Sequence, residues 1–296
     1  MDHFKLKPKH LLYSLFVIIL IFLVATTGFM QYWFMDNKDE KLWTYNNGII
    51  PGAESKIYVG DSDECWVLVH GYTLTPAEMT ELAEQIHQKY KDTVYIPRLD
   101  GHGQVPSELE KYSIEHWYNQ VEQVALENNC QYLVGSSMGA SLVLRYAEEN
   151  SPKKIVLLGT LIKPEPDYLP MTQLIPILAP ILKYTKKSEP GATILNIEAR
   201  KDHISVYNFP LKPVAKLLKF NNLVIQDLDK IESEVLFIHS DKDNVANFEA
   251  AYETYQLLNN KQEFIHLTNG GHVNLKDYDK QIVIQSILDF RESKPQ

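Results

Sequence analysis

The sequence predicts an α/β fold in which an open, mostly parallel β-sheet is covered by helices on both faces. Short runs rich in β-branched and aliphatic residues alternate with amphipathic stretches of helical length. This alternation is typical of β-α-β units. Several of the short runs are apolar at every position, as expected for parallel strands that are buried on both sides.

The expected strands are residues 65–70, 93–97, 131–135, 154–159, 234–239 and 263–267. The expected helices lie at about 76–90, 113–128, 138–149, 246–259 and 277–292. Thr75 and Pro76 mark the start of the first helix, because a threonine N-cap followed by a proline is a common helix start.

One connection is too long for an ordinary crossover between parallel strands. It joins the strands at 154–159 and 234–239, and it contains an apolar, proline-broken stretch at 167–184 and a helical candidate at 213–220. Its apolar content exceeds what a surface connection needs. We expect an insertion at about 161–228 that covers a pocket as a small lid. A second core layer without substrate contact is the alternative.

The amino terminus predicts a membrane anchor. Residues 11–35 carry no charged side chain and end in a cluster of aromatic residues. A helix of that length spans roughly 37 Å, which exceeds a hydrocarbon core of about 30 Å. We expect residues 11–35 to form a transmembrane signal-anchor helix. A cleaved signal peptide is the alternative, although residues 24–30 match a cleavage pattern only loosely.

The charges that flank this run predict its orientation. Lysines precede it and acidic residues follow it. Because positively charged flanks stay in the cytoplasm, residues 1–10 are expected there, and the globular part is expected on the extracytoplasmic side of the cell membrane. Residues 36–50 are polar and rich in turn formers, so they are expected to link the anchor to a domain at 51–296.

Composition excludes several classes of partner. The formal net charge is −9, and no cluster of Lys and Arg follows the first ten residues. Nucleic-acid binding needs such clusters to neutralise phosphates, so no nucleic-acid partner is expected. The sequence also has no Cys/His cluster with zinc-ligand spacing and no glycine-rich phosphate loop, so neither a metal nor a cofactor is expected.

Residues 133–141, LVGSSMGAS, raise the question of a nucleophilic serine. Gly135, Ser137 and Gly139 match the pattern G-x-S-x-G between an expected strand and an expected helix. In that context the pattern forms a tight, strained turn that exposes the central serine. A register centred on Ser136 would place larger side chains at both glycine positions. Ser137 is therefore the predicted nucleophile.

A His-Gly turn follows the first expected strand of the sheet. His70, Gly71 and Tyr72 occupy the place where such an architecture supplies an oxyanion-binding backbone amide. The expected donors are the N–H groups of Tyr72 and of Met138, the residue after the nucleophile. Because these donors belong to the main chain, the side chain of His70 is expected to be structural.

The candidate base and its acidic partner come later in the chain. His272 stands in the glycine-rich loop 268–275, after the last expected strand. In open α/β sheets, catalytic groups lie at the carboxyl ends of strands. Asp241 and Asp243 both follow the strand at 234–239. The order Ser, Asp, His suits either aspartate.

Together these segments resemble α/β-hydrolase-fold carboxylesterases and monoacylglycerol lipases of the compact bacterial type. The resemblance extends from about Pro51 to the end. It rests on PGAESKIYVG, WVLVHGYT, IPRLDGHG, LVGSSMGASLVLRYA, VLFIHSDKDNV and NGGHVNLKDYDKQIVIQSILDF. In that family the acid stands three residues after a small residue, usually glycine, and before a short apolar one. Here Ser240, Asp243 and Val245 take these positions, which favours Asp243 over Asp241.

The resemblance implies a serine hydrolase that cleaves carboxylic esters through the triad Ser137, Asp243 and His272. An apolar face in the insertion would favour short to medium acyl chains, and an anchor beside the bilayer would suit monoacylglycerols or lysolipids. The resemblance implies no cofactor, and a small lid over an acyl pocket. A thioesterase with the same triad and a catalytically silent, membrane-tethered binding module are alternatives. The candidates for an apolar acyl-binding face are Leu169, Met171, Leu174, Ile177 and Leu178.

Cys65 and Cys130 lie near the amino ends of strands that are expected to be neighbours. An extracytoplasmic domain would permit a disulfide. Neighbouring parallel strands rarely offer the required geometry, however, and small buried thiols are common. We therefore expect two buried free thiols.

Overall fold

The structure is a computed structural model of the chain. It describes residues 13–23, 26, 39–165, 175, 179, 183–187 and 191–294, without the side chain of Gln262.

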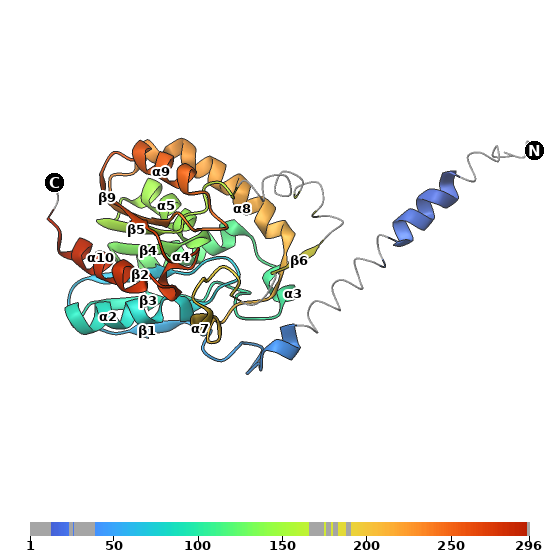
Figure 1. Ribbon diagram of the computed structural model, residues 1–296, viewed down its shortest axis with the longest axis horizontal. Helices are drawn as coiled ribbons and strands as arrows, with labels where there is room; N and C mark the ends of the chain where they lie inside the picture. The colour runs from blue at the N-terminus through green and yellow to red at the C-terminus, as the bar shows by residue number, and fades with distance from the viewer. Residues whose placement is uncertain are drawn as a thin grey trace, which may run out of the picture.

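A seven-stranded sheet forms the centre of the described domain (Figure 1). The strand order is β1-β3-β2-β4-β5-β8-β9. β1 pairs antiparallel with β3, and the other neighbouring strands pair in parallel. The expected open and mostly parallel sheet is therefore confirmed.

The expected strands and helices occur in the expected order, and several short elements that were not expected lie between them. The sheet strands are β1 (Lys56–Tyr58), β2 (Cys65–Val69), β3 (Thr93–Ile96), β4 (Tyr132–Ser136), β5 (Lys154–Leu158), β8 (Glu234–Ser240) and β9 (Lys261–Leu267). The helices are α2 (Thr80–Tyr90), α3 (Pro106–Leu109), α4 (Ile114–Glu127), α5 (Met138–Asn150), α7 (Ile197–Arg200), α8 (Leu211–Val224), α9 (Phe248–Leu257) and α10 (Lys280–Glu292). Short 3-10 helices are η1 (Pro76–Glu78), η3 (Ile225–Lys230) and η4 (Asn274–Lys276).

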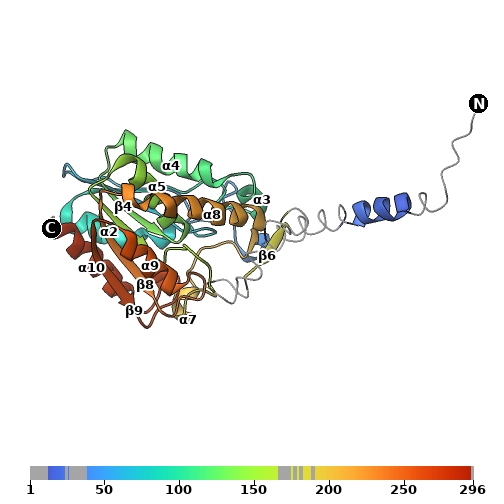
Figure 2. The same ribbon diagram turned by 90° about the horizontal axis from the view of Figure 1, so that it is seen from above.

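Helices cover both faces of the sheet (Figures 1 and 2). Along β2, Val67 and Val69 join one core and Trp66 and Leu68 join the other, because successive side chains of a strand point to opposite faces. The first core is completed by α4, α5, α8 and α9, and the second by α2 and α10. A strand buried on both sides explains why the 65–70 run is apolar throughout.

The long insertion divides into two parts. Leu217 of α8, Val224 and Leu228 pack into the core beside α4 and α5, so this part acts as the additional core layer. The other part contains the antiparallel pair β6 (Tyr184–Lys186) and β7 (Asn208–Pro210), and it contacts the loops at the carboxyl edge of the sheet. The core-layer alternative is therefore confirmed for α8, whereas the lid over a pocket stays a prediction.

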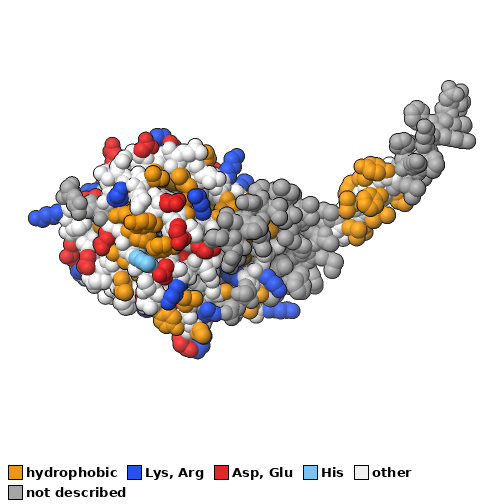
Figure 3. Space-filling model, turned by 45° about the horizontal axis from the view of Figure 1, so that its top comes forward, with side chains coloured by type: hydrophobic (Ala, Val, Ile, Leu, Met, Phe, Trp, Pro, Cys, Tyr) orange, Lys and Arg blue, Asp and Glu red, His pale blue; other side chains and the backbone are white. Residues whose placement is uncertain are grey.

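Most of the expected anchor segment lies outside the described residues. Residues 13–23 form a helix whose apolar side chains are exposed; Phe16 is 63% and Phe22 67% exposed, and Figure 3 shows this helix in orange. Within the part of the chain that the structure describes, no helix is long and apolar enough to cross a membrane.

The expectation of two free thiols is wrong, because Cys65 and Cys130 form a disulfide. Cys65 begins β2, but Cys130 precedes β4, whose pairing with β2 starts at Trp66 and Tyr132. Cys130 lies in the turn between α4 and β4. The geometry of neighbouring parallel strands therefore does not restrict the direction of its side chain. The two Cα atoms are 4.7 Å apart, within the range that a disulfide requires.

The disulfide predicts a measurable loss of stability on its removal. Cys130→Ala is expected to lower the free energy of unfolding by about 2–5 kcal/mol, because the bridge connects residues 65 positions apart and restricts the unfolded chain. Urea unfolding with and without a reductant measures this effect. The reductant should leave the variant unchanged, and titration of two free thiols in the denatured, unreduced protein would contradict the bridge.

Candidate active site

Ser137 lies in a strained turn between β4 and α5. Its backbone has φ 53° and ψ −112°, a region that residues other than glycine rarely adopt because their Cβ atom meets the backbone. Its N–H donates to the carbonyl oxygen of Leu158, at the end of β5, at 2.8 Å. This hydrogen bond from the neighbouring strand helps to hold the strained conformation.

The two motif glycines allow two close backbone approaches. A Cβ atom on Gly135 would lie 2.3 Å from the carbonyl oxygen of Gly139, and a Cβ atom on Gly139 would lie 2.2 Å from the carbonyl oxygen of Val69 in β2. Neither glycine has a positive φ. Any side chain at these positions would therefore push α5 away from the sheet and displace Ser137.

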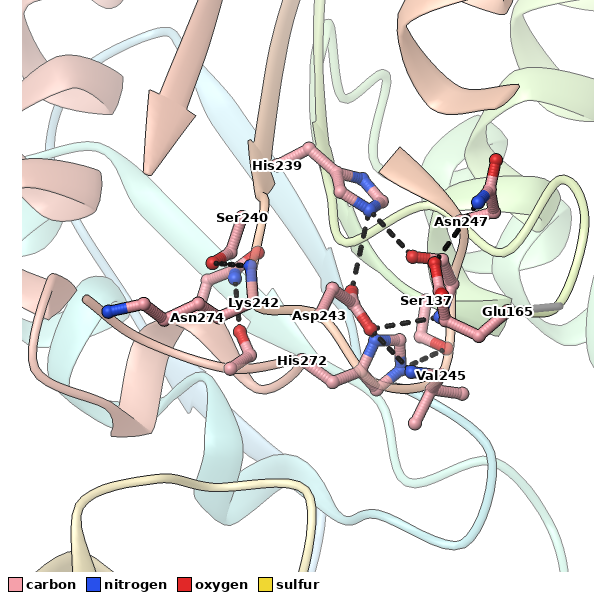
Figure 4. A network of polar contacts seen from close by, with 12 residues as sticks. Ser137, Glu165, His239, Ser240, Lys242, Asp243, Val245, Asn247, His272 and Asn274 are labelled. Carbon is pink, nitrogen blue, oxygen red and sulfur yellow. Dashed lines mark hydrogen bonds and ion pairs between the residues drawn. The ribbon is translucent and has the colours of Figure 1, made fainter. Parts of the chain in front are cut away.

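The structure brings together the three side chains that the sequence singles out (Figure 4). His272 Nε2 lies 2.9 Å from Ser137 Oγ, and His272 Nδ1 lies 2.7 Å from Asp243 Oδ2. All three residues are buried. With Nδ1–H donating to the carboxylate, Nε2 is free to accept the proton of the serine hydroxyl.

The electrostatics of this contact favour a basic imidazole. Burial by itself would lower the pKa of His272, but the carboxylates of Asp243 and Glu78 raise it above its ordinary value of 6.5. Burial would likewise raise the pKa of Asp243, but the charge and hydrogen bond of His272 keep it below its ordinary value. Asp243 therefore stays ionised beside the histidine.

A second histidine contacts the same aspartate. His239 is fully buried in β8, and its Nε2 donates to the carbonyl oxygen of Ala246 at 3.1 Å and lies 3.5 Å from Asp243 Oδ2. Asp243 Oδ1 accepts the N–H groups of Val245 and Ala246 at 2.8 and 2.9 Å. These contacts leave Oδ2 facing His272.

Asp241 points away from this contact. Its carboxylate lies 3.0 Å from His266 Nε2, and the two side chains are 42% and 48% exposed. Ser240, where the resemblance expects glycine, donates its hydroxyl to the carbonyl oxygen of Gly270 at 2.5 Å and accepts the N–H of Lys242 at 3.1 Å. This serine therefore ties the aspartate turn to the histidine loop (Figure 4).

Two further aspartates hold the histidine loop from the other side. Asp279 accepts the N–H of Gly270 at 2.9 Å, and Asp277 accepts the N–H of Gly271 at 2.7 Å. Asp277 also accepts two N–H groups of the insertion, at 195–196. The expected helix at 277–292 begins later, at Lys280, because these carboxylates bind loop amides instead. No local sequence pattern marks this role of the two aspartates.

The two predicted oxyanion donors belong to segments that border Ser137. Met138 is the first residue of α5, so its N–H has no acceptor in the helix. Tyr72 follows Gly71, on which a Cβ atom would lie only 3.3 Å from Ser137 Cβ. Both main-chain segments therefore lie beside the serine from different sides.

The side chain of His70 is structural, as expected. It is fully buried, its Nδ1 lies 2.9 Å from the carbonyl oxygen of Gly71, and its Nε2 accepts the N–H of Leu99 at 3.3 Å. Burial lowers the pKa of His70 to about 4. The neutral ring therefore holds the loop that leads to Tyr72.

Glu78 is a site residue that sequence analysis missed. Its buried carboxylate accepts a hydrogen bond from the Ser136 hydroxyl at 2.6 Å and another from the Gly71 N–H at 3.2 Å. It joins the loop before Tyr72 to the turn before Ser137. In the sequence it falls in an expected amphipathic helix, where a glutamate ordinarily faces solvent, so no local signal marks it.

The predicted acyl-binding residues of the insertion lie outside the described residues; they are Leu169, Met171, Leu174, Ile177 and Leu178. The described part of the insertion reaches the site by other contacts. The carbonyl oxygen of Thr193 accepts the N–H of His272 at 3.0 Å, and that of Pro210 accepts the Tyr72 hydroxyl at 2.8 Å. Among the described residues, no group of three or more His, Cys, Asp or Glu is arranged to hold a metal ion.

Comparisons with known proteins identify the family of the chain. The family model Hydrolase_4, described as serine aminopeptidase, S33, matches residues 60–279. A protein named thermostable monoacylglycerol lipase, from Bacillus sp. (strain H-257), is 29% identical over 255 residues, which cover 82% of this chain and 95% of that protein.

Solved structures share the fold. A chain from the study of LipS and LipT, two metagenome-derived lipolytic enzymes, superposes with a TM-score of 0.74 at 23% identity, over 83% of this chain and all of that one. The monoacylglycerol lipase of Paleococcus ferrophilus gives a TM-score of 0.71 at 18% identity, over 80% and 96% of the two chains. These likenesses confirm the α/β-hydrolase fold.

The raised pKa of His272 predicts how the reactivity of Ser137 depends on pH. Labelling by a fluorophosphonate needs neutral His272 to accept the serine proton, so its rate should fall as the pH drops through a midpoint above 6.5. Glu78→Gln removes a negative charge that stabilises the imidazolium, so this midpoint should move to lower pH. Labelling rates measured from pH 4 to 9 test both expectations.

The matched control for this measurement is Glu84→Gln, which neutralises an exposed glutamate of α2. Its midpoint should equal that of the wild type, because solvent screens its charge. If Glu78→Gln has the same midpoint as the wild type, Glu78 does not raise the pKa of His272.

Proposed function

Because the chain belongs to the Hydrolase_4 family and is a carboxylic ester hydrolase at the level of that family, we propose that it cleaves esters of short to medium acyl chains through Ser137, His272 and Asp243. The observation that carries this proposal is the hydrogen-bonded series from Ser137 Oγ to His272 and on to Asp243, at 2.9 and 2.7 Å. This is the arrangement that nucleophilic acyl transfer needs.

In the acylation step, His272 Nε2 takes the hydroxyl proton of Ser137 while Oγ forms a bond to the ester carbonyl carbon. The carbonyl oxygen gains the negative charge, and the N–H groups of Tyr72 and Met138 donate hydrogen bonds to it. The intermediate collapses as the carbon–oxygen bond to the alcohol breaks. The proton on His272 then passes to the leaving alkoxide, which departs as the free alcohol.

Deacylation repeats these steps with water as the nucleophile. His272 takes a proton from water, the hydroxide attacks the acyl carbon, and the proton returns to Ser137 Oγ as the carboxylic acid leaves. Asp243 keeps the imidazole in the required tautomer and stabilises its charged form in both steps. The protein supplies every group that these steps need, so the proposal requires no cofactor.

We propose monoacylglycerols or lysolipids as the substrate class. The support is the relative named thermostable monoacylglycerol lipase, which matches along 95% of its own length. The apolar sequence of the insertion at 167–184 adds to this support, because each buried methylene of an acyl chain contributes about 0.8 kcal/mol.

We also propose that the domain is held at the extracytoplasmic face of the cell membrane by residues 11–35. The support is the uncharged sequence of this segment and the exposed apolar side chains of the helix at 13–23. The disulfide between Cys65 and Cys130 fits the same location, because such bonds persist in oxidising compartments. An anchored enzyme would meet lipid esters at the bilayer surface.

Ser137→Ala tests the proposed function. Hydrolysis of p-nitrophenyl butyrate and of 1-monoacylglycerols should fall by at least about 10³-fold, because the nucleophile is lost. Asp243→Asn should lose much of the activity, whereas Asp241→Asn, the matched control on the same turn, should keep it. Turnover by Ser137→Ala at the wild-type rate would refute the assignment.

Alkaline extraction of membranes tests the anchor. The full-length chain should sediment with membranes and stay there in sodium carbonate. Ile21→Asp combined with Phe22→Asp should release it, because each charge costs roughly 2.5–3.5 kcal/mol at the centre of a spanning helix. Recovery of a shortened wild-type product in the soluble fraction would instead show a cleaved signal peptide.

A further inference from the structure

The segment that precedes the family match makes specific contacts with the insertion. We name residues 39–43 the amino-terminal strap. The sequence predicts a polar linker here, yet Asp39 is fully buried and Trp43 is half-buried. The N–H of Trp43 donates to the carbonyl oxygen of Asp39 at 3.0 Å, so the strap forms one closed turn.

The strap holds the insertion just before and at the start of β7. The carboxylate of Asp39 accepts the N–H of Tyr207 at 2.7 Å, the N–H of Asn208 at 3.1 Å and the Asn208 side-chain amide at 2.5 Å. Trp43 Nε1 donates to the carbonyl oxygen of Ser205 at 3.1 Å. A buried carboxylate with three N–H donors forms strong, geometrically restrictive bonds, so these contacts fix the position of residues 205–208.

The same stretch of the insertion also contacts the loop that carries the proposed oxyanion donor. The N–H of Val206 donates to the carbonyl oxygen of Thr73 at 3.2 Å, and the Tyr72 hydroxyl donates to that of Pro210 at 2.8 Å. These contacts lie on both sides of the residues that Asp39 holds. Residues 204–210 therefore lie between the strap and the oxyanion loop.

The oxyanion loop depends on such external contacts for its shape. Thr73 has φ 67°, a left-handed conformation that costs free energy in a β-branched residue and persists only where surrounding contacts impose it. Thr73 follows Tyr72 directly. A shift of the insertion at Val206 would therefore move the Tyr72 N–H.

We propose that Asp39 is a positioning residue for the hydrolytic site. Through β7 it holds the loop at 72–75, and through that loop it holds the Tyr72 N–H in line with the N–H of Met138. This inference rests on the proposed function. It extends the set of residues that position the site beyond the family match, which begins at residue 60, and assigns this positioning role to Asp39.

The test uses the full-length chain with Asp39→Asn, which keeps the shape of the side chain but places an amide N–H group against backbone donors. We expect kcat for p-nitrophenyl butyrate to fall by roughly ten- to a hundredfold, because small displacements of catalytic groups have effects of this size. KM should change little, because the substrate pocket is kept. The assay temperature stays well below the unfolding transition of each variant.

The matched control is Glu40→Gln, a change at the exposed neighbour in the strap, which should keep the wild-type kcat. The rescue variant combines Asp39→Asn with Asn208→Asp, which exchanges the carboxylate and the amide. It should recover much of the lost kcat. If Asp39→Asn does not fold, Trp43→Phe removes only the bond to Ser205 and should lower kcat by a smaller factor.

A wild-type kcat in Asp39→Asn, with or without a lower melting temperature, would overturn the proposal and leave a purely structural strap. Ser137→Ala, measured in parallel, separates the two hypotheses. If Ser137→Ala retains turnover, the proposed function fails. If Ser137→Ala is inactive while Asp39→Asn is fully active, only the role of Asp39 fails.

Discussion

The close approach of α5 to the carboxyl end of β2 is the constraint on which the site depends. Gly139 lies against Val69 so tightly that no side chain fits between them, and Gly135 lies as tightly against Gly139. This packing forces Ser137 into a conformation with positive φ. It also places the amino terminus of α5 beside the loop that contains Tyr72. One backbone contact therefore positions the candidate nucleophile and the Met138 N–H, and brings both beside the Tyr72 loop.

Buried carboxylates then fix the loops around this contact. Glu78 joins the oxyanion loop to the nucleophile turn, Asp277 and Asp279 hold the glycine-rich loop of His272, and Asp39 holds the insertion. Each accepts backbone N–H groups that would otherwise lack a partner in a loop. Carboxylates suit this task because charge-assisted hydrogen bonds are short and directional. These hydrogen bonds stabilise loop conformations that regular secondary structure does not provide.

The insertion combines structural and site-forming parts. α8 completes the core against α4 and α5, which anchors the insertion firmly at its carboxyl end. The residues from 191 to 210 instead contact the histidine loop and the oxyanion loop. A movement of residues 191–210 would therefore displace the histidine loop and the oxyanion loop together, while the core stays intact.

The sequence by itself determined the order of the main strands and helices, the candidate nucleophile Ser137 and the candidate base His272, because these depend on local patterns: apolar runs, a glycine-spaced turn and a glycine-rich loop after a strand. It offered two aspartates as the acid, and the family resemblance favoured Asp243. The tertiary structure places Asp243 against His272 and Asp241 against His266 at the surface. It also decided the pairing of Cys65 with Cys130 and the burial of Glu78 and Asp39. These features depend on contacts between segments far apart in the chain, and residue type and spacing carry no information on which distant backbone N–H group a carboxylate will meet.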